Sequence, residues 1–194
     1  MPEKDDRFYI EKVLEGDTAA FAALVERHKN NAFSLALRIT GNREDAEEIA
    51  MDAFVKVYRS LGSFRNDSKF TTWLYRIVHN ESISVLRKKQ PETTPLEDNL
   101  ADDYPSDDIH YRISVQDEIQ QQQLISRALN ELPPADHLLI TLFYMEDQSV
   151  GEISQITGLS QANIKVRLYR TRKRLYQILN RIQCNVPVHE KQIS

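Results

Sequence analysis

Apolar residues recur at helical spacing along most of the chain, and the last long stretch of this pattern predicts a helix with one buried face. From residue 161 onward they fall on one stripe at the 3.6-residue period: Ile164, Leu168, Leu175, Leu179 and Ile182. The opposite side carries Ala162, Val166, Tyr169 and Lys173, with Lys165 and Arg170 on its flanks. This second side is unusual for a surface that only meets solvent.

A shorter helix is predicted directly before this one. Ser149 followed by Glu152 forms the S-x-x-E capping box that begins helices, and Gly158 supplies a residue that tolerates positive φ after the last turn. Ser160 is a candidate N-cap for the longer helix. Two helices joined by so tight a turn are typical of a helix-turn-helix.

The charge of this segment indicates what it binds. Residues 161–185 contain seven basic residues and no acidic one, although the whole chain has a formal net charge of −4. A helix-turn-helix lays its second helix in the major groove, with basic side chains on phosphates. A solvated basic helix in an αα-hairpin is the alternative, and the capping box, the turn glycine and the charge placement argue against it.

The first part of the chain, residues 8–89, also reads as a series of helices. We expect one helix from Phe21 to Thr40 with Asp17 as a fair N-cap, and a second that Gly62 ends. The inner face of the second is predicted to comprise Ala46, Ile49, Ala53 and Val57, and a third helix is predicted to bury Trp73, Ile77, Val78, Ile83 and Leu86.

An acidic strip runs beside the inner face of the second helix. Asp45, Glu48 and Asp52 recur at i, i+3 and i+7, and Lys56 is their one basic i+4 partner. Solubility and complementation of the helix dipole would explain this strip, and so would a docking surface for a basic partner. The residues alone leave both interpretations open.

Aromatic and basic residues are interleaved between positions 64 and 89, where Phe64, Arg65, Lys69, Phe70, Trp73, Tyr75 and Arg76 follow one another. Rings that stack unpaired bases beside a cationic track are what single-stranded DNA binding requires. For Phe70 and Trp73 a place in the core explains the residue equally well. The amide of Asn80 could pair with a base edge.

Composition divides the chain into two domains. Residues 90–111 contain three prolines and seven acidic residues with no Lys or Arg, which predicts an extended linker at 90–112. It separates a first domain, residues 1–89, from a second, residues 113–184, which we expect to form four short helices and to be followed by a flexible tail at 185–194. In that second domain Pro133 and Pro134 begin a helix that packs Leu138, Leu139, Leu142, Phe143 and Met145.

Composition argues against several classes of protein. No stretch reaches the eighteen apolar residues of a membrane span, and the N-terminus has no apolar signal segment, so we expect a cytoplasmic protein without membrane insertion. The single cysteine, Cys184, and five scattered histidines predict neither a disulfide nor a metal site. We expect no cofactor and no small-molecule substrate.

In its segments and their order, the chain resembles the alternative sigma factors of bacterial RNA polymerase, of the compact extracytoplasmic-function (ECF) type. The segment EDAEEIAMDAF resembles the family's helix for binding core polymerase, and FRNDSKFTTWLYRIVHN its promoter-melting segment. The stretch from LNELPPADHLL to RTRKRL resembles its C-terminal promoter-reading domain. The resemblance covers nearly the whole chain, and four segments in the right order make it specific.

The resemblance implies three sets of functional residues and several partners. It assigns Asp45, Glu48, Asp52 and Phe54 to the β′ clamp helices of core RNA polymerase. The downstream, "minus ten" promoter element would be read and melted by Phe64, Arg65, Asn66, Ser68, Trp73, Arg76 and Asn80. The upstream, "minus thirty-five" element would be read by Gln161, Ala162, Asn163, Lys165, Val166, Arg167, Tyr169, Arg170 and Lys173. The implied partners are core RNA polymerase through its β′ clamp helices and β flap, promoter DNA, and an anti-sigma factor.

The sequence departs from the family's common pattern at Ser84, Asn163, Val166 and Thr171. Val166 would offer a methyl contact to a base in place of a hydrogen bond. The sequence also admits two rival functions. An autonomous helix-turn-helix regulator would bind duplex DNA tightly without polymerase. A nuclease using the carboxylates of residues 44–52 is disfavoured because no histidine or lysine accompanies them, so we predict that the protein is not an enzyme.

Overall fold

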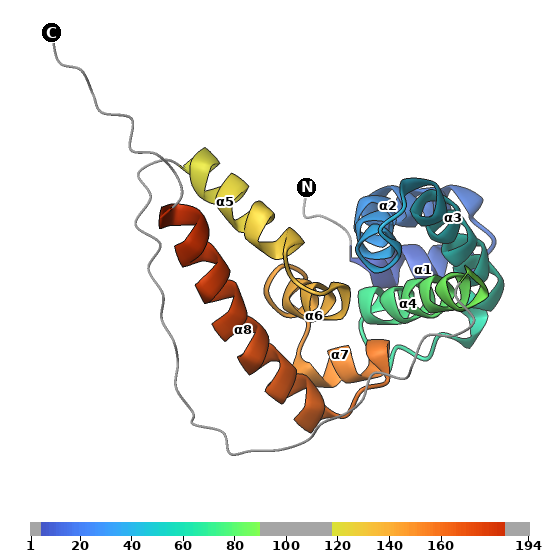
Figure 1. The fold of residues 1–194 in the computed structure, drawn as a ribbon. Coiled ribbons are helices and arrows are strands. Elements are labelled where there is room, and N and C mark those ends of the chain that lie inside the picture. Colours follow the sequence, from blue (N-terminus) through green and yellow to red (C-terminus); the bar gives the residue numbers. More distant parts are fainter. Residues whose placement is uncertain (1–4, 90–117, 185–194) are drawn as a thin grey trace, which may run out of the picture.

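The computed structural model describes residues 5–89 and 118–184, and these form eight α-helices and one 3-10 turn with no strand (Figure 1). The first part comprises α1 (Asp6–Leu14), α2 (Thr18–Thr40), α3 (Arg43–Ser60), η1 (Leu61–Ser63) and α4 (Phe70–Lys89). The second comprises α5 (Glu118–Asn130), α6 (Pro134–Tyr144), α7 (Val150–Thr157) and α8 (Gln161–Cys184). The predicted all-α fold is confirmed. The predicted linker at 90–112 and the predicted tail at 185–194 lie outside the described residues.

Local signals set most helix boundaries in the first part. The Asp17 side chain accepts hydrogen bonds from the backbone N–H groups of Ala19 and Ala20, so α2 begins at Thr18, directly after the predicted N-cap. Gly41 ends α2 with a φ of 66°, which glycine adopts without steric cost. Asn42 then caps α3 by accepting a hydrogen bond from the Asp45 N–H group.

Helices α2, α3 and α4 pack against one another around the core of the first part. The predicted inner face of α3 is buried: Ala46, Ile49, Ala53 and Val57. The predicted stripe on α4 is partly wrong, because this helix buries Leu74, Tyr75 and Val78 while Trp73 and Ile77 are half-buried. The reason is that α4 contacts α7 as well as α2 and α3, which turns its most buried side toward residues 74 and 75.

In the second part, α8 packs against α5, α6 and α7. Four residues of its predicted stripe are buried, namely Ile164, Leu168, Leu179 and Ile182, and Leu175 is half-buried. At 24 residues α8 is longer than the four short helices expected for this domain, and its length agrees with the stripe predicted from Ile164 to Ile182. Met145 was expected to pack in the core and is 50% exposed, because α6 ends one residue before it.

The two parts touch along two helix pairs. Helix α7 lies against α4, and α6 lies against α2, as Figure 1 shows for the orange and green segments. The second part therefore presents the start of its helix-turn-helix to the aromatic-rich helix of the first. No helix in the described part of the chain is long and apolar enough to span a membrane.

Candidate nucleic-acid and polymerase interfaces

The helix-turn-helix is built by short-range hydrogen bonds. The Ser149 hydroxyl accepts the Glu152 N–H at 3.2 Å, and the Glu152 carboxylate accepts the Ser149 N–H at 2.7 Å, which confirms the predicted capping box. Gly158 ends α7 with a φ of 76°. The Ser160 hydroxyl accepts the Asn163 N–H at 3.2 Å, so the predicted N-cap of α8 is also present.

The exposed side of α8 carries most of the residues assigned to the upstream element. Gln161, Ala162, Lys165, Arg170 and Lys173 are exposed, and Val166 and Tyr169 are partly so. The N-terminal turns of the helix, which enter the major groove in this motif, are therefore accessible.

Two of the assigned residues do not lie on that exposed side. Asn163 is only 5% exposed, since it sits in the first turn of α8 beside the buried Ile164. The guanidinium of Arg167 points to the first turn of α6, where it bonds the Asp136 carboxylate at 2.8 Å. Because both side chains face inward, they are poorly placed to contact bases or phosphates.

The aromatic residues before and within α4 form one cluster. The ring centroids of Phe64 and Trp73 are 5.0 Å apart, and Phe70 lies 6.1 Å from each of them. Phe70 is buried and packs on His28, so the interpretation of this residue as core is correct. Trp73 is half-buried and retains an accessible part.

Exposed polar residues precede and follow the aromatic residues along the chain. Arg65, Asn66, Arg76 and Asn80 are exposed, and Ser68 is half-buried. Asn66 adopts a left-handed backbone conformation with a φ of 57°, which turns the loop sharply before α4. Burial lowers the pKa of the neighbouring His79, and its contact with Asn80 acts in the opposite direction. The assigned downstream residues thus lie in the loop before α4 and along α4 itself.

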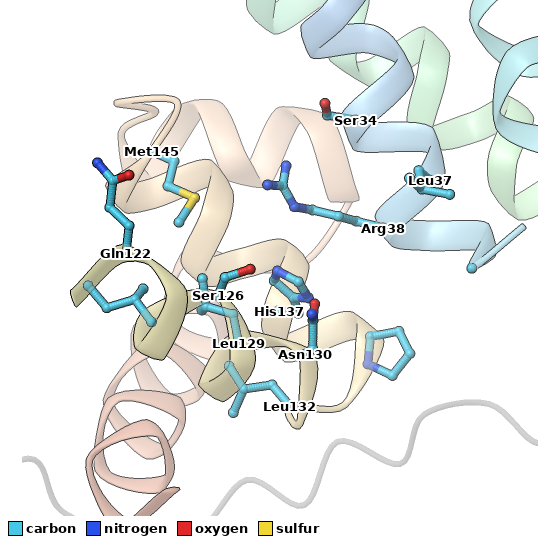
Figure 2. Close-up of a pocket in the computed structure, with 13 residues that line it drawn as sticks. Ser34, Leu37, Arg38, Gln122, Ser126, Leu129, Asn130, Leu132, His137 and Met145 are labelled. Carbon is cyan, nitrogen blue, oxygen red and sulfur yellow. The ribbon is translucent and has the colours of Figure 1, made fainter. Parts of the chain in front are cut away.

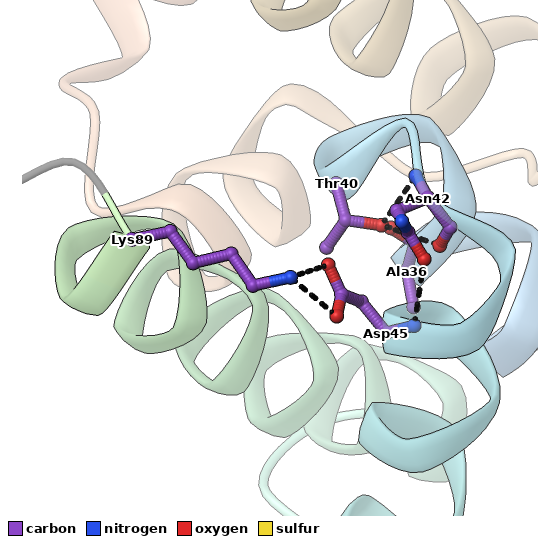
Figure 3. A network of polar contacts seen from close by, with 5 residues as sticks. All are labelled: Ala36, Thr40, Asn42, Asp45 and Lys89. Atoms are coloured by element: carbon purple, nitrogen blue, oxygen red, sulfur yellow. Dashed lines mark hydrogen bonds and ion pairs between the residues drawn. The ribbon is translucent and has the colours of Figure 1, made fainter.

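The acidic strip on α3 differs from its predicted form. Asp45 is bound by the Lys89 ammonium from the end of α4 at 2.6 and 2.7 Å (Figure 3), and Lys56 pairs with Glu81 instead of with the strip. Spacing along one helix could not reveal either pair, because both partners come from α4. Glu48 and Asp52 are exposed and have no ion pair within residues 5–89 and 118–184.

Sequence reasoning missed an apolar surface beside this strip. Met51, Val55 and Tyr58 are 71%, 46% and 49% exposed and follow one another at i, i+4 and i+7 on α3. Val55 and Tyr58 line a hollow of about 480 Å³, and so does the assigned Phe54, which is buried. The sequence could have indicated this surface, because these three large apolar residues fall outside the predicted inner face of α3. A surface of exposed apolar and acidic side chains suits a partner with apolar and basic groups.

Comparison with known proteins follows the same division of the chain. Residues 24–92 match the family model for sigma-70 region 2, and residues 122–175 match the model for sigma-70 region 4. The ECF RNA polymerase sigma factor SigW of Bacillus subtilis is 33% identical over 178 residues, which cover 86% of this chain and 92% of that protein. The chain belongs to the ECF family of RNA polymerase sigma factors.

Further relatives agree with this assignment. The ECF sigma-E factor of Haemophilus influenzae is 32% identical to this sigma factor over 92% of the chain and 95% of that protein. Among solved structures, the sigma factor RpoE of Bartonella quintana in complex with the anti-sigma factor NepR superposes with a TM-score of 0.60. The match has 25% identity and covers 82% of this chain and 96% of that one. The resemblance inferred from the sequence is confirmed.

Family membership also decides between the rival functions. The protein is an alternative sigma factor that directs transcription initiation, and it is not an autonomous regulator. Sigma factors as a family are not enzymes. Within the described residues, no group of His, Cys, Asp and Glu side chains is arranged to hold a metal ion.

Proposed function

We propose that this sigma factor works through three separate surfaces. The acidic and apolar side of α3 docks on the β′ clamp helices of core polymerase. The aromatic cluster with Asn80 holds an unstacked base of the downstream promoter element. The exposed side of α8 reads the upstream element. The observation that carries this division is that each surface is accessible on a different helix.

The α3 surface, defined by Glu48, Met51, Asp52, Val55 and Tyr58, has the composition of a protein interface. Exposed apolar side chains supply area to bury, and the two carboxylates at its margin favour a basic partner and oppose an acidic one. Asp45 lies at the edge of this surface, and the Lys89 ammonium neutralises its charge.

A charge reversal tests the docking surface. Asp52→Lys should abolish binding to core polymerase in a pull-down or by fluorescence anisotropy, while the circular dichroism spectrum stays that of a folded helical protein. Glu26→Lys is the matched control, because Glu26 is an exposed acid on α2 that does not line the hollow. If Asp52→Lys binds core like the unmodified protein, the α3 surface is not the docking site.

The α8 surface is proposed to read duplex DNA through Gln161, Lys165 and Val166, with Arg170 and Lys173 on phosphates. Opening the downstream duplex costs a few kcal/mol, which the pocket for a flipped base near Asn80 must offset. We also propose that the second domain contacts the β flap, which would hold α8 at the upstream element.

Transcription from fragmented genomic DNA of the source bacterium, with and without this protein, tests the whole assignment. Core polymerase supplemented with the sigma factor should start at new positions that share two spaced sequence elements. Binding to core without any new start would contradict the promoter-reading surfaces, and failure to bind core would contradict the proposal as a whole.

We further propose that an anti-sigma protein regulates this factor in the cytoplasm. The supporting observation is the likeness to Bartonella quintana RpoE, whose structure was solved with its anti-sigma factor NepR. Co-purification from the source bacterium, followed by mass spectrometry, should recover such a partner in conditions where transcription from the target promoters is low.

A further inference from the structure

A buried histidine of α2 lies directly behind the aromatic cluster. The His28 ring packs on the Phe70 ring with their centroids 5.2 Å apart, and only 7% of His28 is exposed. Phe70 in turn lies 6.1 Å from the rings of Phe64 and Trp73, which are less buried. His28 therefore reaches the accessible rings of the cluster through one intermediate ring, and it is itself too buried to contact DNA.

A carboxylate of another helix holds the His28 ring. The Nε2 atom of His28 lies 3.0 Å from Oδ2 of Asp6, the first residue of α1. Burial alone would raise the pKa of Asp6, but its hydrogen bond with His28 and its electrostatic interactions with His28 and Arg27 lower that pKa overall. Because an ionised carboxylate can only accept, Nε2 carries the proton of this bond. The ring is thus oriented by a directional contact on the side of α1 while it packs on Phe70.

Arg27 restrains the same carboxylate from the neighbouring position of α2. Its Nε atom lies 3.3 Å from Oδ1 of Asp6, and its guanidinium carbon lies 5.6 Å from the centroid of the Tyr9 ring. Both oxygens of Asp6 therefore face groups of α2, which leaves the carboxylate little freedom to turn away from His28.

Attachment of α1 to the core does not require this polar pair. Ile10 of α1 is only 4% exposed, and Tyr9 and Val13 pack against the same core. An apolar residue at position 28 would attach α1 equally well, because removing a carboxylate and its partner from water costs free energy that their attraction only partly returns. What the hydrogen bond adds is a fixed direction for the ring.

Among the histidines within residues 5–89 and 118–184, only His28 bonds a carboxylate. His137 of α6 lines a groove of about 690 Å³, and Figure 2 shows Arg38 projecting from α2 toward it. Burial lowers the pKa of His137, and the Arg38 charge lowers it further. The Nδ1 atom of His79 is buried without a hydrogen-bond partner in the same part of the chain. The carboxylate partner thus distinguishes the histidine that lies behind the aromatic cluster.

We propose that Asp6 and His28 are positioning residues for promoter melting, because their hydrogen bond fixes the Phe70 ring and, through it, the placement of Trp73. The effect on DNA rests on the proposed function of the aromatic cluster, whereas the effect on Trp73 in the free protein does not. Close-packed rings transmit a small rotation, since no void between them absorbs it. Without the bond the His28 ring turns, and Phe70 tilts into the space that it leaves.

The fluorescence of the free protein tests this coupling, because Trp73 is the only tryptophan of the chain. Asp6→Ala removes the acceptor and leaves all four rings in place. It should shift the Trp73 emission maximum to longer wavelength and increase quenching by acrylamide, since a half-buried ring that loses its support meets more water. Asp6→Asn keeps an oxygen that can accept from Nε2, and its emission should stay close to that of the unmodified protein.

Val13→Ala is the matched control for this measurement. It weakens the apolar attachment of α1 and leaves the bond between Asp6 and His28 intact. Its Trp73 emission should be unchanged, and circular dichroism shows that each variant is folded. Unchanged emission in folded Asp6→Ala would overturn the inference, and so would an equal shift in Val13→Ala.

Promoter opening tests the consequence for DNA, on a promoter found by the genomic transcription experiment. Core polymerase with Asp6→Ala should bind this promoter with unchanged affinity and open it about tenfold more slowly, because a small misplacement of a positioned group is costly. Anisotropy measures binding to core and to DNA, and permanganate reactivity of unpaired thymines follows opening with time. A loss of folded protein would reduce binding and opening together, and that result would overturn the inference.

His28→Gln tests the same bond from α2, because its amide can donate to Asp6 but offers Phe70 no ring. This variant should also slow opening. Since both substitutions act through one contact, the double variant Asp6→Ala with His28→Gln should open the promoter no more slowly than the slower single variant. Defects that multiply in the double variant would show independent actions and overturn the inference.

Trp73→Ala separates the inference from the proposed function. If Trp73→Ala slows opening and Asp6→Ala does not, the cluster keeps its proposed role and the inference is overturned. If Trp73→Ala opens the promoter like the unmodified protein, the proposed role of the cluster is refuted, and shifted Trp73 emission in Asp6→Ala still establishes the coupling.

Discussion

Helices α4 and α8 are both proposed to read promoter DNA, and they are embedded in the protein in opposite ways. Helix α4 packs against α2, α3 and α7 and has buried residues from Phe70 to Ser82, so its reading residues lie at the margin of a core. Helix α8 buries one stripe and leaves a basic side accessible along its length. Substitutions of the reading residues on α4 should therefore also affect folding stability. Substitutions on the accessible side of α8 should alter DNA recognition with little effect on folding stability.

The largest effect should come from the buried side of α4. Leu74 is fully buried, so Leu74→Ala should lower the free energy of unfolding by about 2–5 kcal/mol. Leu175→Ala, at a half-buried position of α8, should cost clearly less. Urea denaturation followed by circular dichroism measures both. Equal losses would show that the two helices are embedded alike.

The next largest effect should be on base preference, which should change at different promoter positions for variants of α4 and of α8. Lys165→Ala should change discrimination by about 1–3 kcal/mol at particular upstream bases, because a side chain on a base edge is lost. Asn80→Ala should change preference only in the downstream element. Transcription from promoters with single base changes gives both profiles, and overlapping profiles would refute the separate roles.

Salt dependence sharpens the difference between the two sides of α8 itself. Lys173→Ala should weaken DNA binding for all sequences and reduce the salt slope by about one. Arg167→Ala should instead lower stability by about 1 kcal/mol, because Arg167 bonds Asp136. Holoenzyme binding to promoter fragments at several salt concentrations measures the slope. A reduced slope for Arg167→Ala would mean that this arginine leaves Asp136 for a phosphate.

The smallest effect should be one of pH. Burial lowers the pKa of His79 in α4 and, together with Arg38, of His137 in α6, so unfolding takes up protons below the ordinary value near 6.5. Stability is therefore full above that pH and falls as the solution is acidified toward the lowered pKa. Between pH 7.5 and 5.5 the melting temperature should drop by about 2–4 °C, the shift expected for a loss near 1 kcal/mol. The double variant His79→Gln with His137→Gln should flatten this dependence, and an unchanged slope would assign it to other groups.

The sequence was most informative where structure is decided by near neighbours. Asp17, the pair Ser149 and Glu152, and Gly158 act within a few residues, so the helix boundaries they set were predictable. The inner face of α3 followed from periodicity alone. Among the candidate sites, the accessibility of Lys165, Arg170 and Lys173 followed from the same period on α8.

Contacts between distant segments were not predictable in this way. Lys89 reaches Asp45 across 44 positions and Arg167 reaches Asp136 across 31, and no periodicity within one helix contains either pair. The rotation of α4 depended on α7, which belongs to the other domain. For the same reason the exposure of Met51 became evident only when the neighbours of α3 were known.

Glu152 belongs to both kinds of contact. Burial alone would raise the pKa of its carboxyl group, but the hydrogen bonds with Ser149 and the charge of Lys69 lower that pKa overall. One side chain thus completes the start of α7 and meets the other domain. Few replacements could serve both purposes: Gln would preserve the cap without the charge, and Asp would fall short of Lys69. Among related proteins, fewer residue types should therefore occur at position 152 than at the positions of the exposed acids Glu48 and Asp52, which make no second contact of this kind.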